Sequence, residues 1–339
     1  MSKQQPKFGL LLPHFGRNAT RDNVVNAAVI IEDAGFDSVW VRDHIVYRPH
    51  GHESPDPTFW EPLVTLGAVA GCTERLVLGT GALIPYRHPL QTALAMATLE
   101  RIAGPGRVIL GIGLGSFDHE FEAVGMGGWD RRKVVREQVE IFRRAWTGET
   151  IDHAGEYYDF SDLQVHPTPI DRDLPIWYSG TSQAAARRAV EYCQGWIPGR
   201  MPRRDIRKRV DRMRRLSEEA DKPMPAVGAI PYVSVSSTME EAMQGINISQ
   251  VAAELAPRFT LPESGGWNTM EDMDGAIIAG TPELVLHEVR ETLHAGVEHL
   301  VFDLRLQFDS WRDKVSQLAE EVLPQLKQTE SSGREAGAS

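Results

Sequence analysis

RVILGIGLGSFDHEFEAVG, residues 107–125, is the stretch that decides the fold. Its apolar residues 108–110 are typical of a short buried strand, and three alternating glycines follow at once. Glycine lets the backbone turn sharply and lets another molecule approach closely. An amphipathic helix is expected further on, over residues 130–146. The stretch therefore predicts a binding site at the carboxyl end of a parallel strand.

The glycine spacing alone leaves more than one interpretation open. Gly-x-Gly-x-Gly after a strand is typical of a dinucleotide-binding turn, and the alternative is a tight turn without a ligand. In the dinucleotide fold the helix starts on the last glycine, whereas here it starts near Asp130. The spacing therefore disfavours a Rossmann fold and favours another α/β architecture.

Short apolar segments alternate with helical patterns along the whole chain. Strands are expected at residues 8–12, 36–41, from 76, 108–110, 176–178, 195–197, 226–235 and 298–304. Eight strand–helix units predict an α/β fold of the closed (β/α)8 TIM barrel type. Two irregular excursions, 151–175 after the fourth unit and 257–274 after the seventh strand, interrupt it, and the first is expected to form a hairpin. We expect one domain over residues 1–327 and a disordered tail over 328–339.

Composition narrows the class of protein. The 339 residues are 42% hydrophobic and 24% charged, as in globular proteins, and no apolar run is long enough to span a membrane. Two cysteines in so long a chain argue against a disulfide framework and favour the cytoplasm. The net charge of −11 argues against nucleic acid as a partner.

In such a barrel, ligands bind at the carboxyl ends of the strands. The residues there are His14 after strand one, Asp43 and His44 after strand two, Gly81 and Ala82 after strand three, Ser116 after strand four, and Ser179, Gly180, Thr181 and Ser182 after strand five. One polar residue at a strand end more often belongs to loop structure, but several at one face indicate a shared cavity.

Two local patterns suggest specific ligands. Residues 179–182 begin a helix, where free N–H groups and hydroxyls suit a phosphate, although plain N-capping by Thr181 or Ser182 explains them equally. His50, His52 and Glu53 suggest a metal, but they lie in a loop without regular spacing and without a matching cluster. We therefore expect no metal site.

Several segments together resemble the bacterial luciferase-like flavin and deazaflavin oxidoreductases. They are FDSVWVRDH (36–44), LGTGALIPYRHP (78–89), GPGRVILGIGLG (104–115), PIWYSGTS (175–182), and GTPE (280–283) with AGVEHL (295–300). The likeness extends over about residues 7–305. The run at 78–89 together with Asp43-His44 is most similar to the branch that depends on coenzyme F420.

The resemblance implies a barrel that binds F420 or, alternatively, FMN at its carboxyl face. It places His44 and Asp43 beside the reactive groups and Gly81 and Ala82 behind the ring, with a cis bond between the last two. It assigns the phosphate side to Gly113, Gly115 and residues 179–182, with His14 and Ser116 also near the cofactor. F420-dependent sugar-phosphate dehydrogenases of this family have a glutamate where this chain has Ser116, which argues against sugar-phosphate oxidation.

Three functions follow as hypotheses. The first is an F420-dependent oxidoreductase that transfers hydride to or from a small organic substrate, with Tyr47, Phe59, Trp60 and Trp267 as walls for an apolar or aromatic molecule. The second is an FMN-dependent monooxygenase that takes reduced flavin from a partner reductase. The third is a non-catalytic ligand-binding barrel. The resemblance also implies a homodimer.

Overall fold

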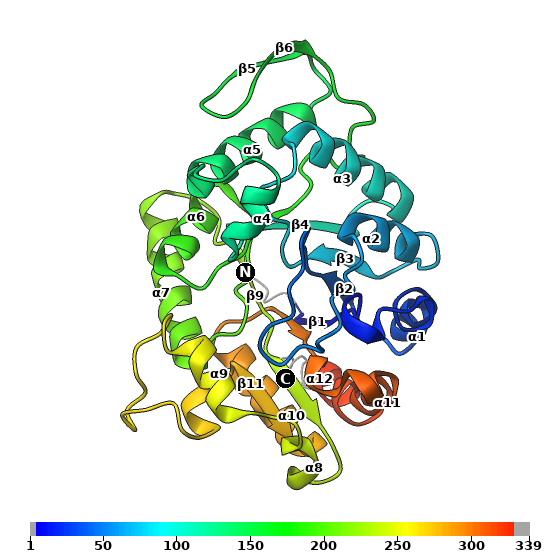
Figure 1. Cartoon of the computed structure of the whole chain (residues 1–339), viewed down its shortest axis with the longest axis vertical. Helices are drawn as coiled ribbons and strands as arrows, with labels where there is room; N and C mark the ends of the chain where they lie inside the picture. Colours follow the sequence, from blue (N-terminus) through cyan, green and yellow to red (C-terminus); the bar gives the residue numbers. More distant parts are fainter. Residues whose placement is uncertain (1–4, 329–339) are drawn as a thin grey trace, which may run out of the picture.

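In the computed structural model, which describes residues 5–328, eight parallel strands close into a barrel surrounded by helices (Figure 1). The barrel strands are β1 (Lys7–Leu11), β2 (Ser38–Val41), β3 (Val77–Thr80), β4 (Val108–Ile112), β7 (Ile176–Tyr178), β8 (Gly195–Trp196), β9 (Ala226–Ala229) and β12 (His299–Phe302). They follow one another around the barrel in chain order, and β12 pairs with β1 to close it. The predicted (β/α)8 barrel is confirmed.

Helices follow the strands and cover the outside of the barrel. They are α1 (Ala27–Asp33), α2 (Pro62–Ala70), α3 (Pro89–Ala103), α4 (Asp118–Ala123), α5 (Arg131–Ala145), α6 (Gln183–Tyr192), α7 (Arg203–Glu219), α8 (Met239–Met243), α9 (Ile248–Leu255), α10 (Pro282–His294), α11 (Trp311–Gln317) and α12 (Leu323–Gln328). The glycine turn after β4 is followed first by the short α4 and then by α5, which begins next to Asp130 as predicted.

Two tryptophans fill the inside of the barrel. The rings of Trp40 and Trp177 are both buried, and their centroids lie 5.7 Å apart. The facing positions must be glycine, because a Cβ atom on Gly79 or Gly195 would come within 2.4 Å of these indole rings. The barrel is therefore a packed core, and a ligand can be held only at its end.

The two predicted excursions lie outside the barrel. The first contains the expected hairpin, formed by β5 (Ile151–Ala154) and β6 (Asp159–Leu163), which projects beyond α5 in Figure 1. Glu137 of α5 holds it, because its carboxylate lies 3.0 Å from Nε2 of His153 and accepts the N–H of Tyr158 at 2.9 Å. The second excursion is largely irregular, also as predicted.

The single strand predicted over residues 226–235 is wrong. Two strands form there instead, because Ile230 and Pro231 separate β9 from β10 (Tyr232–Val235). Proline lacks the N–H that a continuous ladder requires. Beyond the break, β10 leaves the barrel and pairs in parallel with β11 (Ile277–Gly280), a strand that the sequence analysis did not predict.

The predicted tail, 328–339, lies outside the described residues except for Gln328, which ends α12. The extent of the domain, 1–327, stays a prediction. Within the part of the chain that the structure describes, every helix is too short or too polar to cross a lipid bilayer.

Candidate active site

Three of the predicted site residues meet at the carboxyl ends of β3, β4 and β7. A Cβ atom placed on Gly113 would lie 3.5 Å from the Cβ atoms of both Ala82 and Ser179. The peptide bond between Gly81 and Ala82 is cis, as the resemblance implied. Small residues at the ends of three neighbouring strands thus come together, and a side chain at Gly113 would contact the other two.

His44 lies just beyond β2, between an acidic and a basic side chain. Its Nδ1 is 3.2 Å from both carboxylate oxygens of Glu120, and its Nε2 is 3.0 Å from Nη2 of Arg42. Because a carboxylate only accepts and a guanidinium only donates, the ring hydrogen belongs on Nδ1 and the lone pair on Nε2. A neutral histidine in this tautomer can take a proton at Nε2.

Glu120 is the residue of this site that the sequence analysis missed. It lies in the first turn of α4 and also accepts the N–H groups of Ile45 and Val46, at 3.0 and 3.3 Å. Burial raises its pKa, but the hydrogen bond and charge of His44 and the two N–H groups outweigh burial and lower the pKa below its ordinary value. An ionised Glu120 therefore fixes both the ring of His44 and the loop that carries it. The available signal was an acid in the first turn of the helix that follows the glycine turn.

Asp43 was predicted to be catalytic, and in the structure its carboxylate is engaged by other residues of the chain. Its side chain is buried and binds Arg87 through both oxygens, at 2.6 Å to Nη2 and 3.1 Å to Nε. It also accepts the N–H of Ile84 at 2.9 Å. These contacts show a structural role for Asp43, and its catalytic role stays a prediction. Asp43 instead holds the segment after β3 that contains the cis bond.

His14 binds the backbone through both ring nitrogens, and its contact with a cofactor stays a prediction. The residue is 0% exposed, its Nδ1 donates to the carbonyl of Leu12 at 2.9 Å, and its Nε2 accepts the N–H of Arg42 at 3.1 Å. Burial lowers the pKa of His14 to about 4, so the ring is neutral near pH 7. His14 therefore links the ends of β1 and β2 and positions Arg42.

Residues 179–182 were predicted either to bind a phosphate or simply to cap a helix, and different residues of the run fit each interpretation. Ser182 is a plain N-cap of α6, because its Oγ accepts the N–H of Ala185 at 3.0 Å. Among the described residues, the hydroxyls of Ser179 and Thr181 have no hydrogen-bond partner, and both side chains are half-buried. These hydroxyls stand beside the start of a ten-residue helix, where an anion is favoured. Across the turn of β4, Gly115 has φ +71° and Ser116 is exposed.

Two of the four predicted aromatic walls lie beside His44. The ring centroids of Phe59 and His44 are 5.0 Å apart, and those of Phe59 and Tyr47 are 4.9 Å apart. Trp60 and Trp267 do not join them, because both pack against the main hydrophobic core. Trp267 is 7% exposed and is covered by the guanidinium of Arg204 at 4.9 Å, and its role as a pocket wall stays a prediction.

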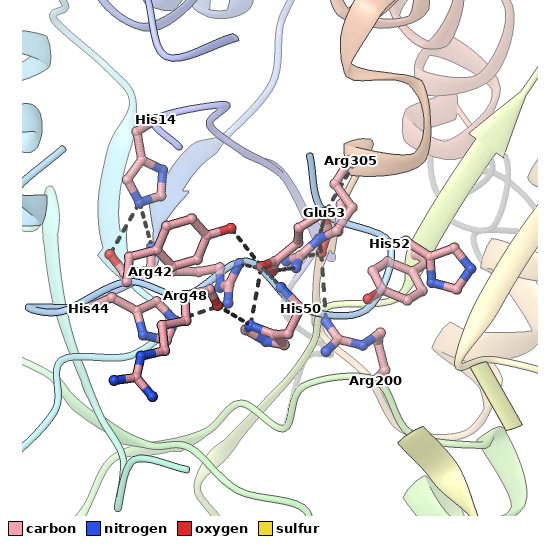
Figure 2. A network of polar contacts seen from close by, with 12 residues as sticks. His14, Arg42, His44, Arg48, His50, His52, Glu53, Arg200 and Arg305 are labelled. Carbon is pink, nitrogen blue, oxygen red and sulfur yellow. Dashed lines mark hydrogen bonds and ion pairs between the residues drawn. The ribbon is translucent and has the colours of Figure 1, made fainter. Parts of the chain in front are cut away.

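A network of buried charges adjoins His44 (Figure 2). Figure 2 shows Arg42, His50 and Arg305 converging on Glu53, whose side chain is only 1% exposed. Glu53 pairs with Arg42 at 2.5 Å and with Arg305 at 2.6 Å. Burial raises the pKa of Glu53, but the two arginines, His50 and the hydroxyl of Tyr47 outweigh burial and hold the pKa far below its ordinary value.

Beyond Glu53 the network continues away from His44. Arg305 is also paired with Asp303, at 2.6 Å, and Arg200 lies 2.9 Å from Glu254. Burial raises the pKa of Glu254, but the hydrogen bond of His52 and the charge of Arg200 bring the pKa down to about 2. The sequence analysis considered only His50, His52 and Glu53 among these residues, as metal ligands, and rejected that metal site. It did not predict the others as site residues.

The chain was compared with known families and structures. The family described as luciferase-like monooxygenase matches residues 7–299. The F420-dependent glucose-6-phosphate dehydrogenase of Amycolatopsis mediterranei is 28% identical over 324 residues, which cover 90% of this chain and 94% of that protein.

Two solved structures illustrate the range of proteins with this fold. An F420-dependent secondary alcohol dehydrogenase in complex with an F420–acetone adduct has a TM-score of 0.78 at 19% identity, covering 95% of this chain and 99% of that one. The oxygenating constituent of 3,6-diketocamphane monooxygenase from Pseudomonas putida, in complex with FMN, has a TM-score of 0.75 at 18% identity, covering 95% and 99%. At these identities the likeness shows the fold alone.

Proposed function

The chain belongs to the luciferase-like monooxygenase family, and we propose that within it the protein is an F420-dependent oxidoreductase that transfers hydride to or from a small organic substrate. The observation that carries the proposal is the meeting of Gly113, Ala82 and Ser179 at the carboxyl end of the barrel, the end at which His44 follows β2. A flat ring fits over small residues, and the free hydroxyls of Ser179 and Thr181 suit a phosphate arm.

Coenzyme F420 ranks above FMN for a reason independent of the fold. The curated relative that matches 90% of this chain is named for F420, whereas the FMN-containing neighbour is similar only in structure. The FMN-dependent monooxygenase stays the second candidate, and it alone would need a partner flavin reductase. A barrel that binds a ligand without catalysis is the third.

Bound F420 supplies the place where hydride is accepted or donated. The chain supplies the proton transfer, because His44 carries its hydrogen on Nδ1 and offers Nε2 as the base. Glu120 holds this tautomer and stabilises the imidazolium that forms when Nε2 takes a proton. Asp43 is a positioning residue, since it fixes the segment after β3 through Arg87 and the N–H of Ile84.

The substrate that we propose has an apolar or aromatic body. Phe59 and Tyr47 lie next to His44, and Phe15 stacks on Phe59 with centroids 5.9 Å apart. Such rings favour contact with an apolar surface. Sugar-phosphate oxidation is disfavoured, because the exposed Ser116 occupies the position at which the F420-dependent sugar-phosphate dehydrogenases of this family have a glutamate.

We also propose a homodimer in the cytoplasm. Exposed apolar side chains lie on the neighbouring helices α2 and α3, where Val64, Leu94 and Ile102 are 73%, 41% and 54% exposed. Such a surface is typical of association between subunits. Sedimentation equilibrium tests it, and a mass of one chain contradicts it. Both cysteines are free, which suits a reducing compartment.

Turnover tests the main proposal. The protein is incubated without oxygen with oxidised or reduced F420 and a panel of alcohols, aldehydes, ketones and aromatic compounds, and the deazaflavin absorption is followed. We expect a substrate-dependent change of this absorption. Oxygen-dependent product formation with reduced FMN, and none with F420, supports the second candidate instead.

A further inference from the structure

Glu53 occupies a ready-made carboxylate site. Its Oε1 accepts hydrogen bonds from Nη1 of Arg42 at 2.5 Å and Nη1 of Arg305 at 2.6 Å. Its Oε2 accepts the hydroxyl of Tyr47 at 2.6 Å and the N–H of His50 at 3.2 Å. Four donors, two of them cationic and deeply buried, thus surround one planar carboxylate, the arrangement that binds such a group most strongly.

The donors and the acceptor belong to different kinds of structure. Arg42 directly follows β2, and Arg305 lies three residues after β12, so the barrel positions both guanidinium groups. Glu53 comes from the loop 48–58, in which no helix or strand is formed. The barrel therefore holds the anion-binding groups, and a loop supplies the anion.

The charges balance only while Glu53 is in place. Arg42, Arg200 and Arg305 face Glu53, Asp303 and Glu254, three cations against three anions. Without Glu53 one buried cation is left uncompensated, which is costly unless another anion replaces the carboxylate. Room for the displaced side chain exists, because Glu53 and Arg305 border a cavity of about 650 Å³.

The same site is connected to His44. Arg42 contacts Glu53 through Nη1 and His44 Nε2 through Nη2, the latter at 3.0 Å. Nε2 is the atom that would exchange a proton with the substrate, and in this arrangement the guanidinium covers it. If another carboxylate replaced Glu53 at Arg42, the contact between Arg42 and Nε2 of His44 would therefore change as well.

We propose that Glu53 is an internal stand-in for a carboxylate of the substrate, and that the substrate is an aromatic or apolar carboxylic acid. Its acid group replaces Glu53 at Arg42 and Arg305, its body lies against Tyr47 and Phe59, and the exchange at Arg42 uncovers Nε2 of His44. The inference rests on the proposed function, since it names the substrate class of that same site.

Benzoate and its neutral analogue benzamide test the inference by isothermal titration calorimetry. The wild type, in which Glu53 competes, is expected to bind benzoate weakly. Glu53→Ala should bind benzoate at least tenfold more tightly than the wild type, while its affinity for benzamide stays the same. Glu156→Ala is the matched control, because Glu156 is an exposed partner of Lys133, and it should behave as the wild type.

An unchanged benzoate affinity in Glu53→Ala, or an equal gain for benzamide, would overturn the inference. If Glu53→Ala does not fold, Glu53→Gln replaces it, because this variant keeps the size of the side chain but removes the charge that repels benzoate. It should show the same preference for benzoate, and the absence of any gain overturns the inference equally. The titration needs no cofactor, so a failure to bind F420 is read separately and bears only on the proposed function.

Discussion

Nδ1 of His44 lies 3.2 Å from both carboxylate oxygens of Glu120, a residue 76 positions further along the chain. The glycine turn after β4 brings this about, because it lets the short helix α4 begin beside the loop that follows β2. The pair defines the tautomer of His44 and with it the atom that can act as a base.

Glu120→Ala should leave the fold intact and remove the preference for the Nδ1–H tautomer. In a hydride-transfer assay we expect kcat to fall by about 100-fold, the scale of a lost acid–base contribution. Nitrogen-15 NMR of the histidine rings measures the tautomer directly in the wild type and in the variant. A wild-type His44 protonated on Nε2 contradicts the assignment.

Asp43→Asn should destabilise the protein without abolishing base chemistry. Removing the charge of the buried Asp43 leaves Arg87 with only the more exposed Glu61, at 2.9 Å, as an ionic partner, and should reduce the free energy of unfolding in urea by about 3 kcal/mol. Asp130→Asn is the matched control, because Asp130 pairs with Arg132, whose side chain is 64% exposed. For this control we expect a much smaller loss, because asparagine keeps the N-cap bond to the N–H of Arg132 and only an exposed ion pair is removed. Equal losses in the two variants would show that Asp43 is not a structural link.

Gly113→Ala tests where the ring of the cofactor lies. Its Cβ would be 3.5 Å from Ala82 and Ser179, an ordinary contact distance, so the melting temperature should stay close to that of the wild type. The added methyl group would stand where the ring is proposed to lie, and the affinity for F420 should fall by about tenfold or more. In Gly111→Ala the Cβ would lie 1.8 Å from the carbonyl oxygen of Thr80, so this variant should not fold. Undiminished F420 binding by Gly113→Ala argues against a ring at this position.

Stability should fall between about pH 6.5 and pH 4 because of two buried histidines. Burial lowers the pKa of both His14 and His299 from 6.5 to about 4. In that interval the unfolded chain binds a proton at each histidine and the folded chain does not, so stability is complete above the interval and is lost as the pH falls through it. At about pH 5 each histidine should account for roughly 2 kcal/mol.

Urea denaturation at about pH 7.5 and pH 5 measures this effect. His299→Asn should remove close to half of the pH dependence, whatever its effect at neutral pH. The lowered pKa values of Glu53, Glu120 and Glu254 act in the same direction, but their effect begins only as the pH approaches the ordinary glutamate pKa of 4.5, so they add little at about pH 5. A free energy of unfolding that is the same at both pH values contradicts the burial of neutral rings.

The barrel could be predicted from the sequence because its signal is local and repeated. Each strand is an apolar segment of a few residues, and each is followed by a helical pattern, so one misread unit does not change the count. The error at Pro231 shows the limit of this signal. Apolar residues continue on both sides of the proline, and only the missing N–H indicates that β9 ends before it.

The site was less predictable, because its polar contacts join segments that are distant in the chain. His44 could be selected from its place after a strand, but the rule that selected it also selected His14 and Asp43. Those two are occupied by the backbone and by Arg87, which the sequence does not show. Glu53 was considered only as a metal ligand, because its partner Arg305 is 252 residues away.

We propose that the strand ends at the carboxyl end of the barrel hold the deazaflavin ring. Equilibrium binding of F420 is the most direct test of this site. The purified protein is titrated with F420 while the fluorescence of the deazaflavin is recorded, with FMN in a parallel titration. We predict saturable binding of one F420 per chain, weaker binding of FMN, and a loss of F420 affinity in Gly113→Ala but not in the exposed control Glu156→Ala. Failure to bind F420, or tight binding of FMN alone, would contradict the account.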